Sequence, residues 1–104
     1  MAVIDMTKAF QDKKPIQTIA SVSHTNWQQV DYPAMTKKIT VGCAGSAMYL
    51  SFSYSDGDAA STVDAAEVAA GAYFEIKVQD GLDSVCLLGK GGAAANVVVC
   101  VEQS

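Results

Sequence analysis

Apolar and polar side chains alternate strictly over residues 72–78 (AYFEIKV), so that Phe74 falls on one side of the run and Glu75 on the other. A period of two residues is typical of a β-strand that buries one of its faces. Gly71 precedes the run and an Asp-Gly pair at 80–81 follows it, and both favour turns. The pattern therefore predicts a strand bounded by two turns.

Runs of the same kind recur along most of the chain, separated by short polar or glycine-containing breaks. The break at 23–26 (SHTN) is turn-like, and Pro33 ends another run because proline cannot donate a ladder hydrogen bond. Gly42 lies inside a run, where glycine is typical of a bulge. The expected strands cover residues 16–23, 27–32, 37–43, 47–54, 72–78, 84–89 and 97–102.

Residues 63–71 (VDAAEVAAG) fit two structures. The high helix propensity of alanine favours a short helix. The strands expected on either side and the glycine at the exit favour a strand that crosses between sheets. We expect the second, which brings the total to about eight strands.

Short strands with a turn every eight to twelve residues are typical of a sandwich, a jelly roll or a barrel. No helical segments separate the runs, which argues against a parallel α/β sheet. We therefore expect an all-β protein: an antiparallel β-sandwich or jelly roll of about eight short strands over residues 15–104, preceded by an N-terminal arm over residues 1–14. The expected core residues are Ile39, Val41, Leu50, Phe52, Phe74, Ile76, Val97 and Val99.

The segment 1–14 has apolar residues with neither a helical nor a strand period. It predicts an arm with one helical turn over Thr7–Gln11 rather than a ninth regular strand. Its apolar side chains are too many for a solvated tail, so we expect the arm to pack either on its own sandwich or on a neighbour, with a second copy or another partner as the simplest solution. Deletion of residues 1–12 should then leave the sandwich folded. The apolar arm residues are Val3, Ile4, Met6 and Phe10.

Charge excludes one class of partner. The net charge is −4, and all seven basic residues are lysines. Nucleic-acid binding needs a basic surface and draws on arginine for forked contacts, so we expect no nucleic-acid partner. The N-terminus lacks the basic and apolar pattern of a signal peptide, and no stretch has the length of a membrane span. We expect synthesis in the cytoplasm and no membrane partner.

The chain has three cysteines, Cys43, Cys86 and Cys100, and no two of them form a C-x-x-C pair. All three lie in apolar runs. We expect buried free thiols that act as small hydrophobic side chains, as befits a reducing compartment, and neither a metal site nor a redox site.

Residues with catalytic or ligating potential are scattered. His24, the only histidine, lies in a turn, and the acidic loop with Asp56, Asp58 and Asp64 does not match the spacing of a calcium loop. The sequence Gly-Lys-Gly-Gly at 89–92 lacks the other residues of a phosphate loop and predicts a hairpin loop. We expect no enzyme activity, no cofactor and no metal.

The aromatic residues could form a sugar-stacking platform, although strand aromatics more often pack in a core or an interface. Trp27, next to the polar turn at 23–26, is the best exposed contact residue among them, and we add Tyr32 to the candidate interface with the apolar residues of the arm. The aromatic residues considered are Trp27, Tyr32, Tyr49, Tyr54 and Tyr73.

Two segments resemble the capsid decoration, or cement, proteins of tailed bacteriophages. Residues 25–60 contain a tryptophan strand, a turn ended by proline, and strands of the form K-x-I-T-V and A-x-Y-x-S-F. Residues 68–102 contain the strand A-G-A-Y-F-E-I and a final hairpin of small residues and valines. The resemblance implies a structural virion protein on the outside of a phage head that bridges capsomers.

The partners that this resemblance implies are the phage major capsid protein and further copies of the chain. We expect a homotrimer first and a dimer second. Two alternatives stay open: a carbohydrate- or receptor-binding sandwich, and a neck or tail component of a phage. The candidate interface residues are Val3, Ile4, Met6, Phe10, Trp27 and Tyr32.

Overall fold

The computed structural model describes residues 2–43, 45–53, 65–78 and 84–103. In this part of the chain there are nine strands and no helix. The strands are β1 (Ala2–Asp5), β2 (Ile16–Val22), β3 (Gln28–Asp31), β4 (Thr36–Cys43), β5 (Met48–Ser53), β6 (Ala66–Val68), β7 (Tyr73–Lys77), β8 (Ser84–Gly89) and β9 (Ala94–Gln103).

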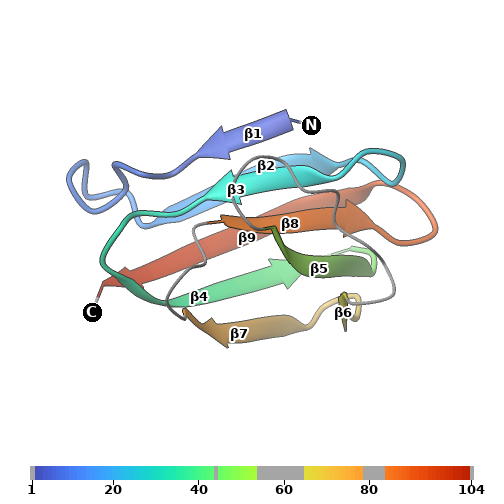
Figure 1. Cartoon of the computed structure of the whole chain (residues 1–104). Helices are drawn as coiled ribbons and strands as arrows, with labels where there is room; N and C mark the ends of the chain where they lie inside the picture. The colour runs from blue at the N-terminus through green and yellow to red at the C-terminus, as the bar shows by residue number, and fades with distance from the viewer. Residues whose placement is uncertain (1, 44, 54–64, 79–83, 104) are drawn as a thin grey trace.

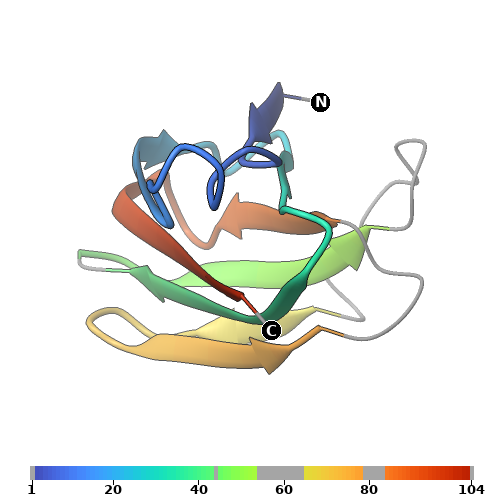
Figure 2. The ribbon, with the colours of Figure 1, turned by 90° about the vertical axis from the view of Figure 1, so that its left-hand side faces the viewer.

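The strands form two sheets that pack face to face (Figures 1 and 2). One sheet has five strands in the order β1-β3-β8-β5-β6, and the other has four in the order β2-β9-β4-β7. The molecule measures 35 × 26 × 21 Å along its principal axes. The predicted all-β sandwich is confirmed.

The strands pair in a nested series. β2 pairs with β9, β3 with β8, β4 with β7 and β5 with β6, all antiparallel. Successive pairs alternate between the two sheets. Within the four-stranded sheet, β4 pairs with β9 and so joins the two pairs of that sheet; within the five-stranded sheet, β5 pairs with β8 in the same way. The strand β6 lies in the five-stranded sheet and β7 in the other, so the connection over residues 69–72 crosses between the sheets. The sequence predicts a crossing within 63–71, but as one strand, and the described strand there covers only Ala66–Val68.

Alternating valines and isoleucines build the core. In β4, Ile39 and Val41 are fully buried, and Val41 pairs with Val99 of β9. Burying each such side chain is worth roughly 1.5–3 kcal/mol relative to exposure. Of the eight residues expected in the core, six are buried, namely Ile39, Val41, Leu50, Ile76, Val97 and Val99.

Phe74 corrects the core prediction, because its side chain is 39% exposed. Phe74 and the buried Ile76 are two residues apart, so their side chains point to the same face of β7. However, β7 is an edge strand of its sheet, so the large ring of Phe74 lies at the rim of the core. The side chain of Phe52 lies outside what the structure describes.

The N-terminal segment corrects a second expectation. Residues 2–5 form a regular strand, β1, which pairs in parallel with β3 at the edge of the five-stranded sheet (Figure 1). Beyond it, Met6 and Ala9 are 4% and 6% exposed and belong to the core of this same chain. The segment therefore packs on its own sandwich, which the irregular spacing of its apolar residues concealed.

A single helical turn follows β1, as the sequence predicts. The carboxylate of Asp5 accepts hydrogen bonds from the N–H and the hydroxyl of Thr7, which caps the start of the turn. At its end, the Lys14 N–H donates to the Ala9 carbonyl over 2.8 Å, and Lys13 has a left-handed φ of 57°. This is the geometry of a Schellman cap, and it turns the chain toward β2.

Two glycine predictions fail. The register of β4 against β9 shifts between Thr36 and Lys38, and not at Gly42. The glycine-rich segment 90–93 is not a hairpin, because β8 and β9 belong to different sheets and the segment connects one sheet to the other. A loop is a hairpin only if the two strands that it connects pair with each other, and the sequence of the loop does not determine that pairing.

Candidate interaction surfaces

The described residues include no group of three or more His, Cys, Asp or Glu side chains that could hold a metal ion. His24 is exposed in the turn between β2 and β3, where the Ser23 hydroxyl accepts hydrogen bonds from the N–H groups of Thr25 and Asn26. The acidic loop residues Asp56, Asp58 and Asp64 lie outside the described residues. Nor does the described part of the chain hold a helix long and apolar enough to span a membrane.

None of the three cysteines is in a disulfide, and they differ in exposure. Cys43 and Cys86 are buried, as expected, and the Cys43 thiol donates to the carbonyl of Ser46. Cys100 is only half-buried, which corrects the expectation that all three are buried. It alternates with the buried Val99 and Val101 of β9, so its thiol lies on the opposite face of the strand, away from the core.

The outward side of the four-stranded sheet forms the first candidate surface, which we call the outer face. Directly opposed residues of antiparallel strands share a face, so the register assigns its members. Thr18, Val98, Gly42 and Tyr73 form one row across the sheet, and Ile16, Cys100, Thr40 and Glu75 form the next. A third row holds Glu102, Lys38 and Lys77.

Apolar side chains stand exposed on this outer face. Ile16 is 59% exposed, Val98 37% and Tyr73 70%. Gly42 lies between Val98 and Tyr73 in its row and has no side chain, so it leaves a shallow gap. The gap is large enough for a methyl group, because a Cβ built at Gly42 would lie 3.6 Å from the Tyr73 Cβ, an ordinary contact distance. Apolar side chains and small residues alternate along this row, so raised and recessed positions alternate and another surface can pack against them.

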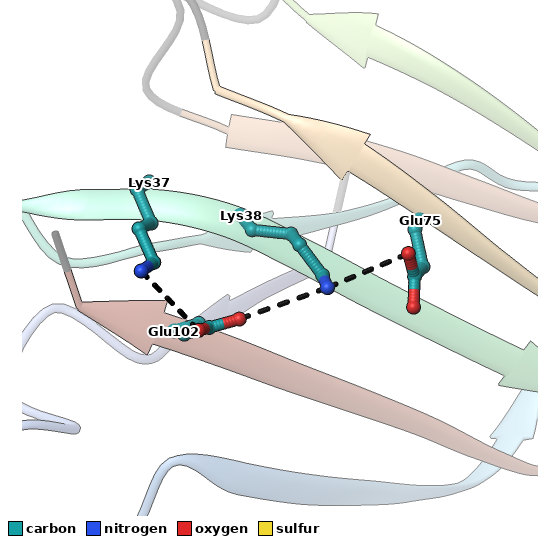
Figure 3. Close-up of polar contacts among 4 residues, drawn as sticks. All are labelled: Lys37, Lys38, Glu75 and Glu102. Carbon is teal, nitrogen blue, oxygen red and sulfur yellow. Dashed lines mark ion pairs between the residues drawn. The ribbon is translucent and has the colours of Figure 1, made fainter.

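An ion-pair cluster occupies the end of the outer face away from the Val98–Tyr73 row (Figure 3). Lys38 of β4 lies between Glu75 of β7 and Glu102 of β9, with Nζ to carboxylate oxygen distances of 3.4 and 3.8 Å. Lys37 also contacts Glu102, at 3.4 Å. Because these side chains are largely solvated, each pair is worth at most about 1 kcal/mol of stability. Their main effect is to fix the positions of charges on the face.

A hollow of about 450 Å³ lies beside this cluster at the end of the four-stranded sheet. It is open and solvated, and a small-molecule pocket is typically apolar and enclosed. The hollow is therefore a depression at the end of the sheet and does not have the shape of a catalytic cleft. Its lining residues are Lys37, Lys38, Lys77, Val78 and Glu102.

The six residues expected at an interface all belong to β1, to the turn after it, or to the ends of its partner strand β3, at one edge of the five-stranded sheet. β1 and the turn after it supply four of them, while Trp27 and Tyr32 directly flank β3, the partner of β1. Val3 is 54% exposed, and Ile4, Phe10 and Trp27 are half-buried. Met6 and Tyr32 are buried beneath them. Their role as an interface stays a prediction, and we call this set the edge surface.

The described aromatic residues do not converge on one platform. Tyr73 is on the outer face of the four-stranded sheet, whereas Trp27, Tyr32 and Tyr49 belong to the five-stranded side. Lys90 lies over the Tyr49 ring at 5.8 Å from its centroid and also pairs with Glu67, so this ring is already engaged. A continuous stacking surface is not formed by these residues.

Neither a protein-family model nor a curated protein matches the sequence of this chain.

Proposed function

We propose that this protein is a structural virion protein that binds the outside of a phage head as a decoration protein and bridges capsomers. The nested strand pairing supports a jelly-roll topology, since a long antiparallel ribbon rolled into two sheets gives this order. Jelly rolls are common in viral capsid and lectin domains. Fold alone does not establish function, so the proposal depends on a surface.

The observation that carries it is the edge surface. β1 is the outermost strand of its sheet, so the backbone on its far side has no neighbouring strand among the described residues. A free strand edge can accept an added strand from another protein through backbone hydrogen bonds. Val3, an exposed apolar side chain of β1, would then provide the apolar contact.

Such a contact is small, so stable binding to a capsid would require many copies of the contact to act together. A strand of four residues forms only a few backbone hydrogen bonds, each worth about 0.5–1.5 kcal/mol net. When each bound copy contacts two capsomers, or several copies act together, the modest contacts sum through a high effective concentration. The proposed partner is therefore the phage major capsid protein in its assembled form.

Cosedimentation with empty heads assembled from a phage major capsid protein tests the proposal. We expect the wild-type protein to pellet with the heads and Val3→Lys to be retained much less. Ala93→Lys makes the same charge change at an exposed residue of the β8–β9 connection and should bind normally. Equal retention of both variants, or no binding of the wild type, would contradict the proposal.

The same assay separates the alternatives. Retention on isolated necks or tails, and not on heads, would make the protein a neck or tail component. Binding to an array of immobilised glycans would favour a carbohydrate-binding module, for which the exposed Tyr73 ring is the stacking candidate. In that case Tyr73→Ala should abolish glycan binding.

A further inference from the structure

The outer face of the four-stranded sheet matches its own image under a two-fold rotation. Consider an axis parallel to the strands, placed midway between the two central strands, β9 and β4. Rotation by 180° about this axis lays β9 of a second copy over β4 of the first, and β2 over β7. Each row of the face keeps its level along the axis, so the residues that would meet follow from the register alone.

The middle row is complementary in size. Val98 would lie over Gly42 of the second copy, and Tyr73 would lie over Thr18. In each pair a larger side chain opposes a smaller residue, and the rotation produces each contact twice. Self-complementarity of this kind is what a two-fold interface requires.

The charged row is complementary in sign. Glu102 would lie over Lys38 of the second copy, and Lys38 over Glu102. Within one chain the two side chains already lie 3.8 Å apart, so their charged ends occupy the centre of the row (Figure 3). Association would join the two pairs into a network of four charges instead of opposing like charges.

The remaining contacts are compatible with this arrangement. Cys100 would face Thr40 of the second copy, and Ile16 would face the stem of Glu75, whose carboxylate is held by Lys38 at 3.4 Å. Lys77 lies at a corner, level with Lys14 just before β2 of the second copy, and the roughly 30° angle between packed sheets separates these two like charges. No like charges are brought together at the centre.

We propose that the outer face is a self-association surface, whose partner is the outer face of a second copy of this chain. Four strands about 4.8 Å apart and about 20 Å long present roughly 400 Å² per copy, or about 800 Å² in the pair. Stable interfaces bury roughly 1,200–2,000 Å², so this dimer is a weak one. The inference does not depend on the proposed capsid binding, which uses the other sheet.

The decisive experiment exchanges the central charges between chains. Lys38→Glu and Glu102→Lys each place like charges opposite each other in a dimer of identical variants. An equimolar mixture of the two variants restores an attractive pair at both positions. Sedimentation equilibrium from about 10 µM to about 1 mM should show the wild type associating, each variant at least tenfold weaker, and the mixture recovering association.

Matched controls separate this effect from a general effect of charge or folding. Lys90→Glu and Glu67→Lys alter an exposed ion pair on the five-stranded sheet and should leave self-association unchanged. Circular dichroism of each variant checks that the sandwich is intact. A wild type that stays monomeric at the highest concentration, a mixture no better than its components, or equally affected controls would each overturn the proposal.

Cys100 supplies a second readout that needs no substitution. Its half-buried thiol lies on the outer face and would be covered in the dimer, whereas Cys43 and Cys86 are buried in the monomer. The alkylation rate of Cys100 should therefore fall several-fold as the wild-type concentration rises. In Glu102→Lys that rate should not depend on concentration. A wild-type rate that does not change with concentration would contradict the proposal even if sedimentation detects a dimer, because that dimer would use another surface.

Discussion

At the scale of single residues, Gly89 shows how long-range packing constrains one position. A Cβ there would collide with the backbone oxygen of Gly92 and lie 3.1 Å from the Ala94 nitrogen and the Val22 oxygen. The Gly89 N–H also donates to the Ser23 carbonyl over 2.8 Å. The sequence alone shows a glycine-rich loop, but the requirement for glycine comes from the way this loop folds back on Gly89 and, less closely, from β2, which precedes it by more than sixty residues.

Gly89→Ala should lower the free energy of unfolding by about 1–3 kcal/mol, because backbone atoms must move to admit the methyl group. Gly92→Ala is the matched control, since nothing lies within 4 Å of its added Cβ. Urea denaturation followed by circular dichroism measures both. Equal midpoints for the two variants would show that the backbone around Gly89 relaxes freely.

The cap at Asp5 predicts a pH dependence. Hydrogen bonds from the Thr7 hydroxyl and N–H, together with the nearby Lys8, hold the pKa of the Asp5 carboxyl below its ordinary value of 3.8. A lowered pKa in the folded state stabilises the fold above the unfolded pKa, and this stabilisation is lost as the pH falls through the folded value. Asp5→Asn should therefore destabilise the protein more at pH 7 than at pH 3, measured by the urea midpoint. The same difference at both pH values would rule out the ionised carboxylate as the cause.

At the scale of elements, alternation located strands such as β4 and β7, which bury one face. β8 is buried on both faces, and its continuous apolar run, bounded by turns, identified it instead. The pattern is weak where a strand is short and at an edge. In β1 the exposed Val3 is followed by the half-buried Ile4, and the deeply buried Met6 comes after the strand has ended. A run that passes from a strand into a capped turn has no single period, which is why this segment was expected to be an arm.

Met6→Ala tests the role of the N-terminal segment in the fold. Met6 is 4% exposed within the core cluster, so its truncation should cost about 2–5 kcal/mol of unfolding free energy. Met35→Ala is the control, because Met35 is 64% exposed and its loss should change stability by less than about 0.5 kcal/mol. Thermal denaturation of both variants gives the comparison. The earlier expectation that deletion of residues 1–12 leaves the sandwich intact holds only if Met6→Ala proves harmless.

At the scale of the whole molecule, the sequence indicated two packed sheets but not which strands pair. The alternation of residues 97–102 puts Val97, Val99 and Val101 on one buried face, and this is observed. Cys100 was expected to be buried, but it lies on the opposite face beside Val98. The alternation does not predict that Gly42 lies beside Val98, because that contact depends on the register between β4 and β9. The candidate surfaces combine residues from distant strands, so they could be found only after the fold was known.

Nested pairing predicts slow folding. Ile16 pairs with Cys100, which is 100 − 16 = 84 residues further along the chain. Such non-local pairing places two-state folding in the range of roughly milliseconds to seconds. Stopped-flow refolding followed by fluorescence of Trp27, the only tryptophan, measures the rate. A main phase in microseconds would show that the transition state does not require the long-range pairs.

The central position of β9 in its sheet has a consequence for synthesis on the ribosome. β9 hydrogen-bonds to both β2 and β4, yet it is the last of the described strands to be made. While the polypeptide is still growing, β2 and β4 have no strand between them, and their apolar faces stay accessible. The four-stranded sheet can close only after translation has passed residue 103, so the nascent chain stays exposed to aggregation and to chaperones until β9 has been made.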